Sequence, residues 1–244
     1  MDRLGIDIGG SGIKGAPVDV AAGILSQERV RLPTPAPATP EAVIETVADV
    51  AGRFTTSGAV GVTVPAAVQR GIVRTAANID PSWIEVDAVG RLTARLDRPV
   101  VVLNDADAAG IAEMRFGAGR DQRGTVMIVT LGTGIGTAIF VDGRLVPNLE
   151  LGHIEVRGRE AEVRAAAVVR TQKSLSIEAW AKRVDEVLRT YEKLIWPDLF
   201  IISGGVSKRA WKFIGLFTTR APVVAAELRN DAGIVGAAVA ASEA

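Results

Sequence analysis

A carboxylate and an amine flank a short glycine-rich run near the start of this sequence. Asp7 precedes Gly9-Gly10-Ser11-Gly12, and Lys14 follows it. Glycine leaves backbone amides accessible to phosphate oxygens. A carboxylate such as Asp7 can hold Mg²⁺ through water, and Lys14 can neutralise phosphate charge. The segment is therefore a candidate phosphate site, and a turn that needs its glycines only for positive φ is the alternative.

A second glycine-rich run, Gly132-Thr133-Gly134-Ile135-Gly136, lies about half a chain further on, and β-rich segments flank it as they flank the first. Repetition of one pattern in both halves indicates a duplicated lobe. Two such tips can hold a chain of phosphates from both sides of a cleft. Neither has the spacing of a Walker loop, and neither opens a helix as a dinucleotide-binding loop does, which argues against a nicotinamide cofactor.

Asn104 and Asp105 follow an apolar strand-like segment and begin an alanine-rich stretch with helical character. In an open α/β sheet this position faces the ligand-binding crevice. A carboxylate there can accept the proton of a hydroxyl that attacks phosphorus, so Asp105 is the candidate catalytic base. Simple capping of the helix by Asn or Asp is the structural alternative.

The segment from Glu150 to Glu155 groups two carboxylates around a Gly-His pair that contains the only histidine of the chain, His153. Sugar hydroxyls both donate and accept hydrogen bonds, so carboxylate and imidazole partners suit them. We expect Glu150 and His153 to bind hydroxyls rather than only to pack or cap. Pro65 and Asn78 lie in turn-rich segments and are further candidates for a sugar pocket, with plain turn chemistry as the alternative.

Two further features concern the phosphate donor. Ser203-Gly204-Gly205 ends a strand-like segment and could admit a flat base or another phosphate, although a plain strand-to-helix turn has the same sequence. Five cations lie close together in the chain: Arg157, Arg159, Arg164, Arg170 and Lys173. They could form a track for a long anion, but the interleaved Glu155, Glu160 and Glu162 also suit an ordinary surface helix.

The composition narrows the chemistry. The chain has 244 residues, 48% of them hydrophobic, and its 28 Lys and Arg balance 28 Asp and Glu, so no overall charge attracts nucleic acid. It has no cysteine and one histidine, which excludes thiolate nucleophiles and cysteine-ligated zinc. No apolar run reaches the roughly 20 residues that span a bilayer, so we expect a soluble, cytoplasmic protein. Phosphoryl transfer, which depends on positioning and electrostatics, fits these limits.

Hydrophobic periodicity predicts the elements that position these residues. In the first half we expect strands at 3–8, 12–18, 25–32, 58–64 and 99–103. We expect helices at 86–96 and 105–116, and one that follows residue 40 and ends at about residue 53. In the second half we expect strands at 125–131, 137–141 and 198–202, and helices at 176–195 and 231–243. A stiff connector at 33–40 precedes the first helix.

These elements predict an α/β protein of two lobes with a cleft between them. Residues 1–103 form a small lobe with the first hairpin, and residues 104–244 a larger lobe with Asp105, the sugar segment and the second glycine tip. We expect the C-terminal helix to pack back on the first lobe. A single doubly wound sheet is the alternative, but parallel strands are joined by helical crossovers, which leaves both hairpins unexplained.

In this order, the motifs resemble the ROK family of sugar kinases and repressors, which has the two-lobed actin-like ATPase (ribonuclease H-like) fold. The residues that carry the resemblance are Asp7–Lys14, Gly61–Pro65, Asn104-Asp105-Ala106, Leu131–Gly136, Glu150–His153 and Ser203–Val206. It covers nearly the whole chain. Within the family, the sequence is most similar to the actinobacterial branch that phosphorylates glucose from inorganic polyphosphate, often also from ATP.

The resemblance implies roles for residues. Asp105 would deprotonate the sugar 6-hydroxyl, and the sugar would lie among Pro65, Asn78, Asn104, Asp105, Glu150, His153 and Glu162. Phosphate would lie at Asp7, Gly9, Gly10, Ser11, Gly12, Lys14, Gly132, Thr133, Gly134, Gly136, Gly204 and Gly205, with Mg²⁺ near Asp7. Many family members have a cysteine-rich zinc motif after the Gly-His pair. This chain has none, so we expect no zinc and expect other packing to fix His153.

We therefore expect a kinase that transfers phosphate from polyphosphate or ATP to the 6-hydroxyl of glucose, with mannose open as a second acceptor. An ATP-dependent kinase for another hexose and a non-catalytic sugar-sensing module are the alternatives. A repressor is not expected, because the first strand already begins at residue 4 and leaves no room ahead of it for a helix-turn-helix domain. The resemblance also implies a homodimer that binds neither nucleic acid nor membrane.

Overall fold

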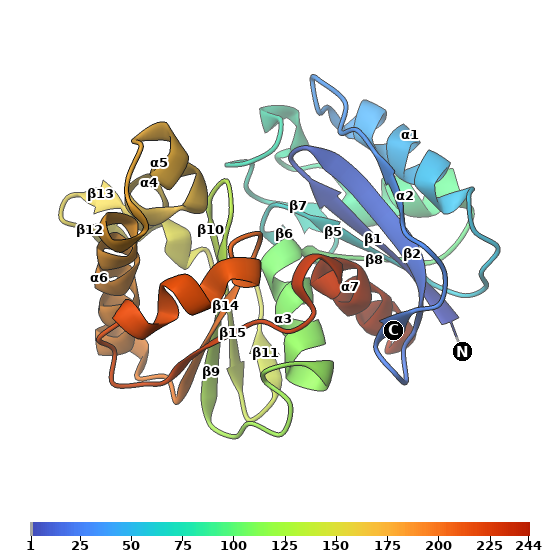
Figure 1. Ribbon diagram of the computed structural model, residues 1–244. Helices are drawn as coiled ribbons and strands as arrows, with labels where there is room; N and C mark the ends of the chain where they lie inside the picture. Colours follow the sequence, from blue (N-terminus) through green and yellow to red (C-terminus); the bar gives the residue numbers. More distant parts are fainter. Residues whose placement is uncertain (1) are drawn as a thin grey trace. The chain divides into compact units, whose positions relative to one another are not determined.

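The computed structural model describes residues 2–244, which divide into two compact units (Figure 1). Unit 1 contains the chain up to Ala112 together with Asp231–Ala244, and unit 2 contains Glu113–Asn230. Each unit has its own hydrophobic core around its own sheet. None of the helices described has the length and apolar character that a membrane crossing requires.

Unit 1 is built on a six-stranded sheet with the order β3-β2-β1-β5-β8, and β4 also pairs with β2. Its strands are β1 (Asp2–Gly9), β2 (Gly12–Asp19), β3 (Ile24–Leu25), β4 (Val30–Leu32), β5 (Val60–Val64) and β8 (Val100–Asn104). β1 and β2 form an antiparallel hairpin, whereas β1, β5 and β8 run parallel. The carboxyl ends of these three parallel strands therefore meet at one edge of the sheet.

The helices of unit 1 are α1 (Pro40–Ala51), α2 (Ala88–Leu96), the first two turns of α3 (Asp105–Phe116) and α7 (Ala232–Ser242), and a small hairpin of β6 (Val68–Gln69) and β7 (Ile72–Val73) follows β5. α1 begins at residues that favour the start of a helix. The side chain of Thr39 accepts a hydrogen bond from the backbone N–H of Ala42, and Pro40 lies in the first turn. Its buried Val43, Ile44, Val47 and Val50 have the spacing of one helix face.

Unit 2 contains a five-stranded sheet with the order β11-β10-β9-β14-β15. Its strands are β9 (Thr125–Leu131), β10 (Ile135–Val141), β11 (Arg144–Val146), β14 (Leu199–Ser203) and β15 (Val223–Ala225). The helices α4 (Ala161–Ala165), α5 (Ala167–Gln172) and α6 (Ile177–Ile195) and the short hairpin of β12 (Glu155–Val156) and β13 (Arg159–Glu160) complete it, with 3₁₀ turns at Leu151–His153 and Ser207–Lys212.

The two sheets have the same topology. In each, a glycine-tipped antiparallel hairpin is followed by two strands that run parallel to its first strand, and the strand orders correspond position by position. The predicted two-lobed α/β fold is confirmed. One expected strand was wrong in detail: residues 25–32 form two short strands, because residues 26–29 leave the sheet between β3 and β4.

α7 packs on the sheet of unit 1, where Figure 1 shows it beside β1 and β5. A Cβ added to Gly5 would lie 2.0 Å from the carbonyl oxygen of Ile234, and one added to Gly61 would lie 1.8 Å from that of Ala237. Only glycine permits this approach of helix and strand backbones. Because the start of α3 also packs against α7 through Gly236, the chain divides at Ala112, beyond the boundary at residue 103 that we predicted.

Candidate active site

The first glycine tip joins β1 to β2, with Gly9 paired to Gly12 and the exposed Gly10 and Ser11 between them. Asp7 and Lys14 lie directly opposite each other in this hairpin, and Lys14 Nζ lies 3.5 Å from Asp7 Oδ2. The structure thus brings together the carboxylate, the amine and the glycine amides that the sequence pattern singled out.

Thr63 on β5 holds Asp7 in place and was not predicted as part of the site. Its hydroxyl donates to Asp7 Oδ1 at 2.9 Å and accepts from the backbone N–H of Ile8 at 3.2 Å. Thr63 is fully buried in a strand whose other members are valine and glycine. A polar residue in such a run needs a partner, and this was the signal that could have identified it.

Asn104 and Asp105 stand where β8 ends and α3 begins. The side-chain oxygen of Asn104 accepts hydrogen bonds from the backbone N–H groups of Ala106 and Asp107 at 2.7 and 3.1 Å, and its amide nitrogen donates to the carbonyl of Ala66 at 3.2 Å. Asn104 is buried, so it caps the helix and fixes the loop after β5. Asp105 Oδ1 accepts from the N–H of Ala106 at 2.8 Å.

Pro65 and Asn78 lie on the long connection after β5. Pro65 is half-buried next to Ala66, whose carbonyl binds the amide of Asn104. Asn78 is exposed in the loop before Pro81–Trp83. The structure therefore places Pro65 beside the end of β8 and gives no side-chain contact that ties Asn78 to it.

In unit 2, the segment that carries Glu150 and His153 is anchored to β10 and α6. The hydroxyl of Thr137 donates to the carbonyl of Leu149 at 2.7 Å and accepts from the N–H of Leu151 at 3.2 Å. The phenol of Tyr191 donates to the carbonyl of Leu151 at 2.9 Å. Gly152 packs so closely that an added Cβ would lie 2.1 Å from the carbonyl oxygen of Ile135. These contacts fix the turn that presents His153.

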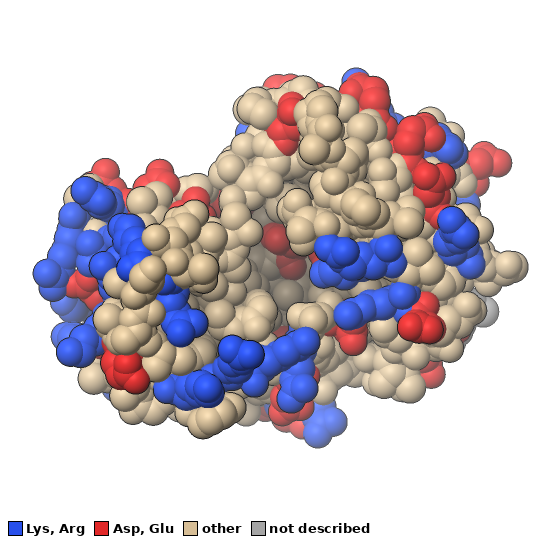
Figure 2. Space-filling model, turned by 45° about the horizontal axis from the view of Figure 1, so that its top comes forward, with Lys and Arg blue, Asp and Glu red and all other residues tan. Residues whose placement is uncertain are grey.

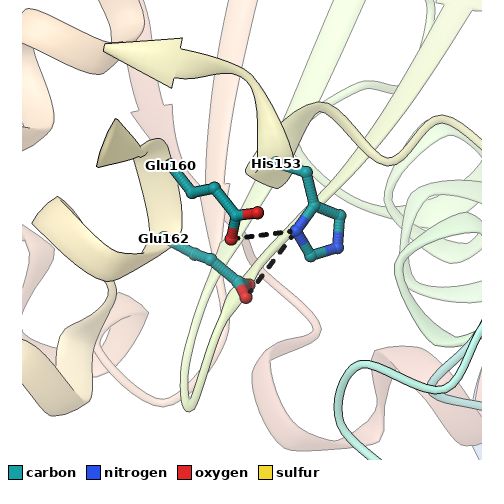
Figure 3. Close-up of side chains that lie close together, drawn as sticks. All are labelled: His153, Glu160 and Glu162. Carbon is teal, nitrogen blue, oxygen red and sulfur yellow. Dashed lines mark hydrogen bonds and ion pairs between the residues drawn. The ribbon is translucent and has the colours of Figure 1, made fainter. Parts of the chain in front are cut away.

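Glu160 and Glu162 approach the same nitrogen of His153 from β13 and α4 (Figure 3). His153 Nδ1 lies 3.4 Å from Glu160 Oε2 and 3.9 Å from Glu162 Oε1, and Nε2 lies 3.9 Å from Glu150 Oε2. One carboxylate oxygen of Glu162 also accepts from the N–H of Ile135 in the second glycine tip at 3.2 Å. The structure thus unites three predicted sugar ligands and adds Glu160, which was not a predicted ligand.

The surroundings of Glu150 raise its pKa. Burial raises the pKa of Glu150, and the negative charge of Glu162 adds to the rise, while His153 opposes it. Burial also raises the pKa of Tyr191. Within residues 2–244, His153, Glu160 and Glu162 form the group whose ligand atoms, all within 4.8 Å, have the types that metal ions bind. Hydroxyl groups of a sugar need the same donors and acceptors.

The second glycine tip and the Ser203-Gly204-Gly205 turn lie side by side in unit 2. Gly204 has φ of +85°, and a Cβ there would lie 2.5 Å from the carbonyl oxygen of Leu131, the residue before Gly132. The carbonyl of Gly132 accepts from the N–H of Val168 at the start of α5. The second glycine tip, which includes Thr133 and Gly136, therefore lies beside the Gly204-Gly205 turn.

A cavity of about 350 Å³ opens next to this turn, between α5, α6 and the 3₁₀ turn after β14. Trp180 and Phe213, packed edge to face at 5.0 Å, form its apolar floor. Arg170, Lys208 and Arg209 line it with positive charge, and Gly205 and Val206 complete the wall near the turn. The cavity thus combines an apolar lining with cations, directly beside the second candidate phosphate site.

The suggested basic track is only partly supported by the side chains. Lys and Arg gather at the edge of unit 2 that carries α4, α5 and α6, on the left in Figure 2, with Asp and Glu among them. Arg157 and Arg164 both form ion pairs with Glu186 on α6, so they serve to hold the 157–164 segment to that helix. Arg170 alone of the five lines the cavity.

A family model described as the ROK family matches residues 3–166, which is more than half of the chain. The protein belongs to the ROK family. Its two-unit α/β architecture, with a hairpin and two parallel strands in each sheet, is the actin-like ATPase fold of that family.

Particular relatives are more informative than the family. The chain is 52% identical to the polyphosphate glucokinase of Mycobacterium tuberculosis over 238 aligned residues. The alignment covers 97% of this chain and 90% of the relative. The solved structure of the inorganic polyphosphate/ATP-glucomannokinase from Arthrobacter sp. strain KM matches with a TM-score of 0.96 and 50% identity, over 99% of this chain and 98% of that one. A ROK family glucokinase from Streptomyces griseus, in complex with glucose and AMPPNP, matches over 100% of both chains with a TM-score of 0.86 and 25% identity.

Proposed function

We propose that this protein transfers a phosphoryl group from inorganic polyphosphate or ATP to the 6-hydroxyl of glucose. The observation that carries the proposal lies at one edge of the sheet in unit 1. Asp7, Thr63 and Asp105 stand at or just after the carboxyl ends of β1, β5 and β8, where open α/β sheets bind ligands. A phosphate-binding hairpin and a carboxylate base at one edge are what phosphoryl transfer to a hydroxyl requires.

Asp105 acts as the base in this proposal. It accepts the proton of the 6-hydroxyl as the oxygen forms its bond to the terminal phosphorus and the bond to the leaving phosphate oxygen breaks. Asn104 places Asp105 by capping α3. In unit 2, Glu150, His153 and Glu162 hold the other hydroxyls, and Glu162 links them to the glycine tip through the N–H of Ile135.

The residues at the first tip fit a magnesium ion. Mg²⁺ is bound in many kinases by one or two carboxylates together with phosphate oxygens of the substrate and water. Asp7 offers such a carboxylate, held by the hydroxyl of Thr63 and partly exposed beside the glycine amides. A bound Mg²⁺ would supply neutralisation of the phosphate charge. Lys14 and the amides of Gly9 to Gly12 share that task.

Two features support the choice of donors. The relatives named for polyphosphate use cover nearly the whole chain at 50% identity or above. The cavity beside Gly205 also suits a nucleobase, because Trp180 and Phe213 give it an apolar floor and Arg170, Lys208 and Arg209 give it positive charge. Polyphosphate needs only the phosphate surfaces, whereas ATP would use the cavity as well.

The test is formation of glucose 6-phosphate by the purified protein with Mg²⁺ and either long-chain polyphosphate or ATP. Asp105→Asn is expected to lower kcat on the order of 10²-fold, because the base is lost while the side-chain shape remains. Asp97→Asn removes an exposed carboxylate at the end of α2 and is the matched control, expected to keep full activity. Near-normal turnover of Asp105→Asn would rule out Asp105 as the base.

Comparison of acceptors separates the remaining alternatives. Turnover with mannose at a rate near that with glucose would extend the activity to both sugars. Turnover with another hexose but not with glucose would favour the alternative kinase. Binding of hexose without turnover from either donor would favour a sugar-sensing module.

The proposal also includes a cytoplasmic homodimer, which the family resemblance supports. Light scattering on the purified protein measures the mass in solution against the 25.5 kDa of one chain. A mass of one chain at micromolar concentration would contradict the dimer.

A further inference from the structure

Arg31 lies over the tip of the first hairpin, although nothing in the motif Asp7–Lys14 points to it. β4 pairs antiparallel with β2, and Arg31 stands directly opposite Lys14. Asp7 stands opposite Lys14 on the other side. Residues directly opposite in an antiparallel pair share one face of the sheet. Asp7, Lys14 and Arg31 therefore form a row across three neighbouring strands.

The side chain of Arg31 runs from this row toward the glycine tip. Its Nη2 donates to the carbonyl of Ser11 at 2.6 Å and lies 3.3 Å from the Ser11 hydroxyl. A Cβ added to Gly12 would lie 2.5 Å from Arg31 Nε, so the absence of a side chain at position 12 gives the guanidinium its place. Gly12 is accordingly buried beneath an exposed arginine. The guanidinium is thus fixed beside the amides that bind phosphate in the proposed function.

The charges at this tip are unbalanced. Lys14 lies near Asp7, but Arg31 makes no ion pair with any carboxylate in residues 2–244. Its Nε and Nη1 likewise have no hydrogen-bond acceptor among the described residues. Like charges directly opposite in a sheet destabilise it. Lys14 on β2 and Arg31 on β4 are two cations opposite each other, and Asp7 on β1 is the one carboxylate in this row. The row therefore has an excess of positive charge that an anion from solution can neutralise.

We propose that Arg31 is a donor-binding residue whose guanidinium contacts phosphate groups of the phosphoanhydride chain at the first hairpin. This inference rests on the proposed function, because it assigns a further contact in the same site. A guanidinium binds two oxygens of a phosphate through parallel N–H groups, whereas the ammonium of Lys14 acts as a point charge. Polyphosphate presents a phosphate at every position along the chain, whereas ATP ends in a neutral nucleoside, so the contact favours polyphosphate.

Steady-state kinetics at saturating glucose and Mg²⁺ tests the inference with Arg31→Ala, and Arg53→Ala is the matched control. Arg53 is an exposed arginine of the same unit, beyond the end of α1, and has no side-chain partner among residues 2–244. Arg31→Ala is expected to raise the KM for long-chain polyphosphate about 10-fold or more, as loss of one charged hydrogen-bonded contact does. The KM for ATP should rise less. The KM for glucose, measured with glucose varied at saturating polyphosphate, should match that of Arg53→Ala.

Arg31→Lys keeps the charge but loses the planar fork, so its KM for polyphosphate should lie between those of wild type and Arg31→Ala. Thermal unfolding shows whether each variant is folded, and Arg31→Lys serves if Arg31→Ala is not. A KM for each donor equal to that of Arg53→Ala would overturn the inference. An equal rise in the KM for ATP and in the KM for polyphosphate would overturn the stated preference of the contact for polyphosphate.

Direct binding separates this inference from the proposed function. Calorimetric titration of the wild-type protein with tripolyphosphate, without glucose, needs no turnover. If the wild type phosphorylates no hexose, weaker tripolyphosphate binding by Arg31→Ala than by Arg53→Ala still supports the phosphate contact. Equal binding by the two variants overturns it.

Discussion

Glu160 contacts the Nδ1 atom of His153, and this contact decides which ring nitrogen remains for a ligand. The carboxylate of Glu160, 3.4 Å away, accepts a hydrogen bond from Nδ1–H in the tautomer that it favours, and this leaves Nε2 toward Glu150. In a chain without cysteine, Glu160 thus supplies packing that fixes the imidazole. We expect Glu160→Gln to raise the KM for glucose about 5-fold while kcat at saturating glucose changes less, because orientation and not proton transfer is lost.

Glu155→Gln is the control for this prediction. Glu155 stands opposite Glu160 in the β12–β13 pair and is exposed, so the two variants remove the same charge from one hairpin. Glucose kinetics and thermal unfolding should be measured for both. An equal KM for glucose in the two variants would mean that Glu160 does not position His153.

Glu150 gives the site a pH-dependent stability. Because burial raises its pKa in the folded protein, the folded state holds this proton more tightly than the unfolded state. The resulting stabilisation is present below the ordinary glutamate pKa of about 4.3 and is lost as pH rises through the raised value. Glu150→Gln cannot titrate. The free energy of unfolding of Glu150→Gln should therefore increase relative to wild type as pH rises from about 4 to 7.

Urea unfolding at a series of pH values in that range measures the difference. Groups that do not interact with Glu150 titrate alike in both proteins, so their contributions cancel in the comparison. A difference between wild type and Glu150→Gln that stays constant across the range would contradict the raised pKa.

At the scale of elements, α7 depends on glycines in the strands beneath it. Gly5 and Gly61 are paired between β1 and β5, and backbone atoms of α7 occupy the space that their side chains would need. A methyl group at Gly61 must push α7 outward, because the obstacle is the carbonyl of Ala237 and no flexible side chain can yield. Gly61→Ala should lower the free energy of unfolding by about 1–3 kcal/mol or more.

Gly215→Ala is the matched control, because an added Cβ there meets no atom within 4 Å. Thermal or urea unfolding of the two variants provides the measurement. A Gly61→Ala protein as stable as Gly215→Ala would show that helix and sheet can separate without cost.

Elements and motifs were predictable where the signal is local. The helix over Asp105–Phe116 begins and ends at the predicted residues, and the two glycine tips join antiparallel strands as expected. Asp7 and Lys14, which flank the first tip in the sequence, lie opposite each other because a hairpin fixes its own register.

Contacts that depend on the pairing of distant segments were not predictable. Arg31 faces Lys14 only because β4 returns to β2 in one register, and Glu186 on α6 neutralises Arg157 and Arg164 from far along the chain. The segment with Glu160 has no apolar period that would fix its direction, so its approach to His153 was hidden. A one-residue shift in the register of β4 against β2 would have turned Arg31 to the opposite face of the sheet.

At the scale of the whole molecule, the chain forms two hydrophobic cores that share no residue. One contains side chains from Leu4 to Val100, and the other contains side chains from Met127 to Ala221. The chain leaves unit 1 within α3 and returns at Asp231 to add α7. Unit 1 therefore contains both the N-terminal part of the chain and its C-terminal helix.

A truncation after Asn230 tests this dependence. α7 is apolar around its whole circumference, and eight of its residues, from Ala232 to Ala241, are buried, so it is an interior helix of unit 1 that packs on β1 and β5. Its removal would expose the glycine face of β1 and β5 to water. We expect the truncated chain to lose the native fold of unit 1 and all kinase activity, while unit 2 keeps its own core and resists proteolysis as a fragment near 113–230.

Truncation after Ser242 is the control, because it removes only the two residues beyond α7 and should leave stability and activity unchanged. Circular dichroism, mass spectrometry of protease-resistant fragments and the glucose assay distinguish the two proteins. A chain that ends at Asn230 and still unfolds in one transition at the wild-type temperature would show that α7 is dispensable. Complete digestion of that chain would show instead that unit 2 also requires unit 1, so the two cores would form one cooperative unit despite sharing no side chain.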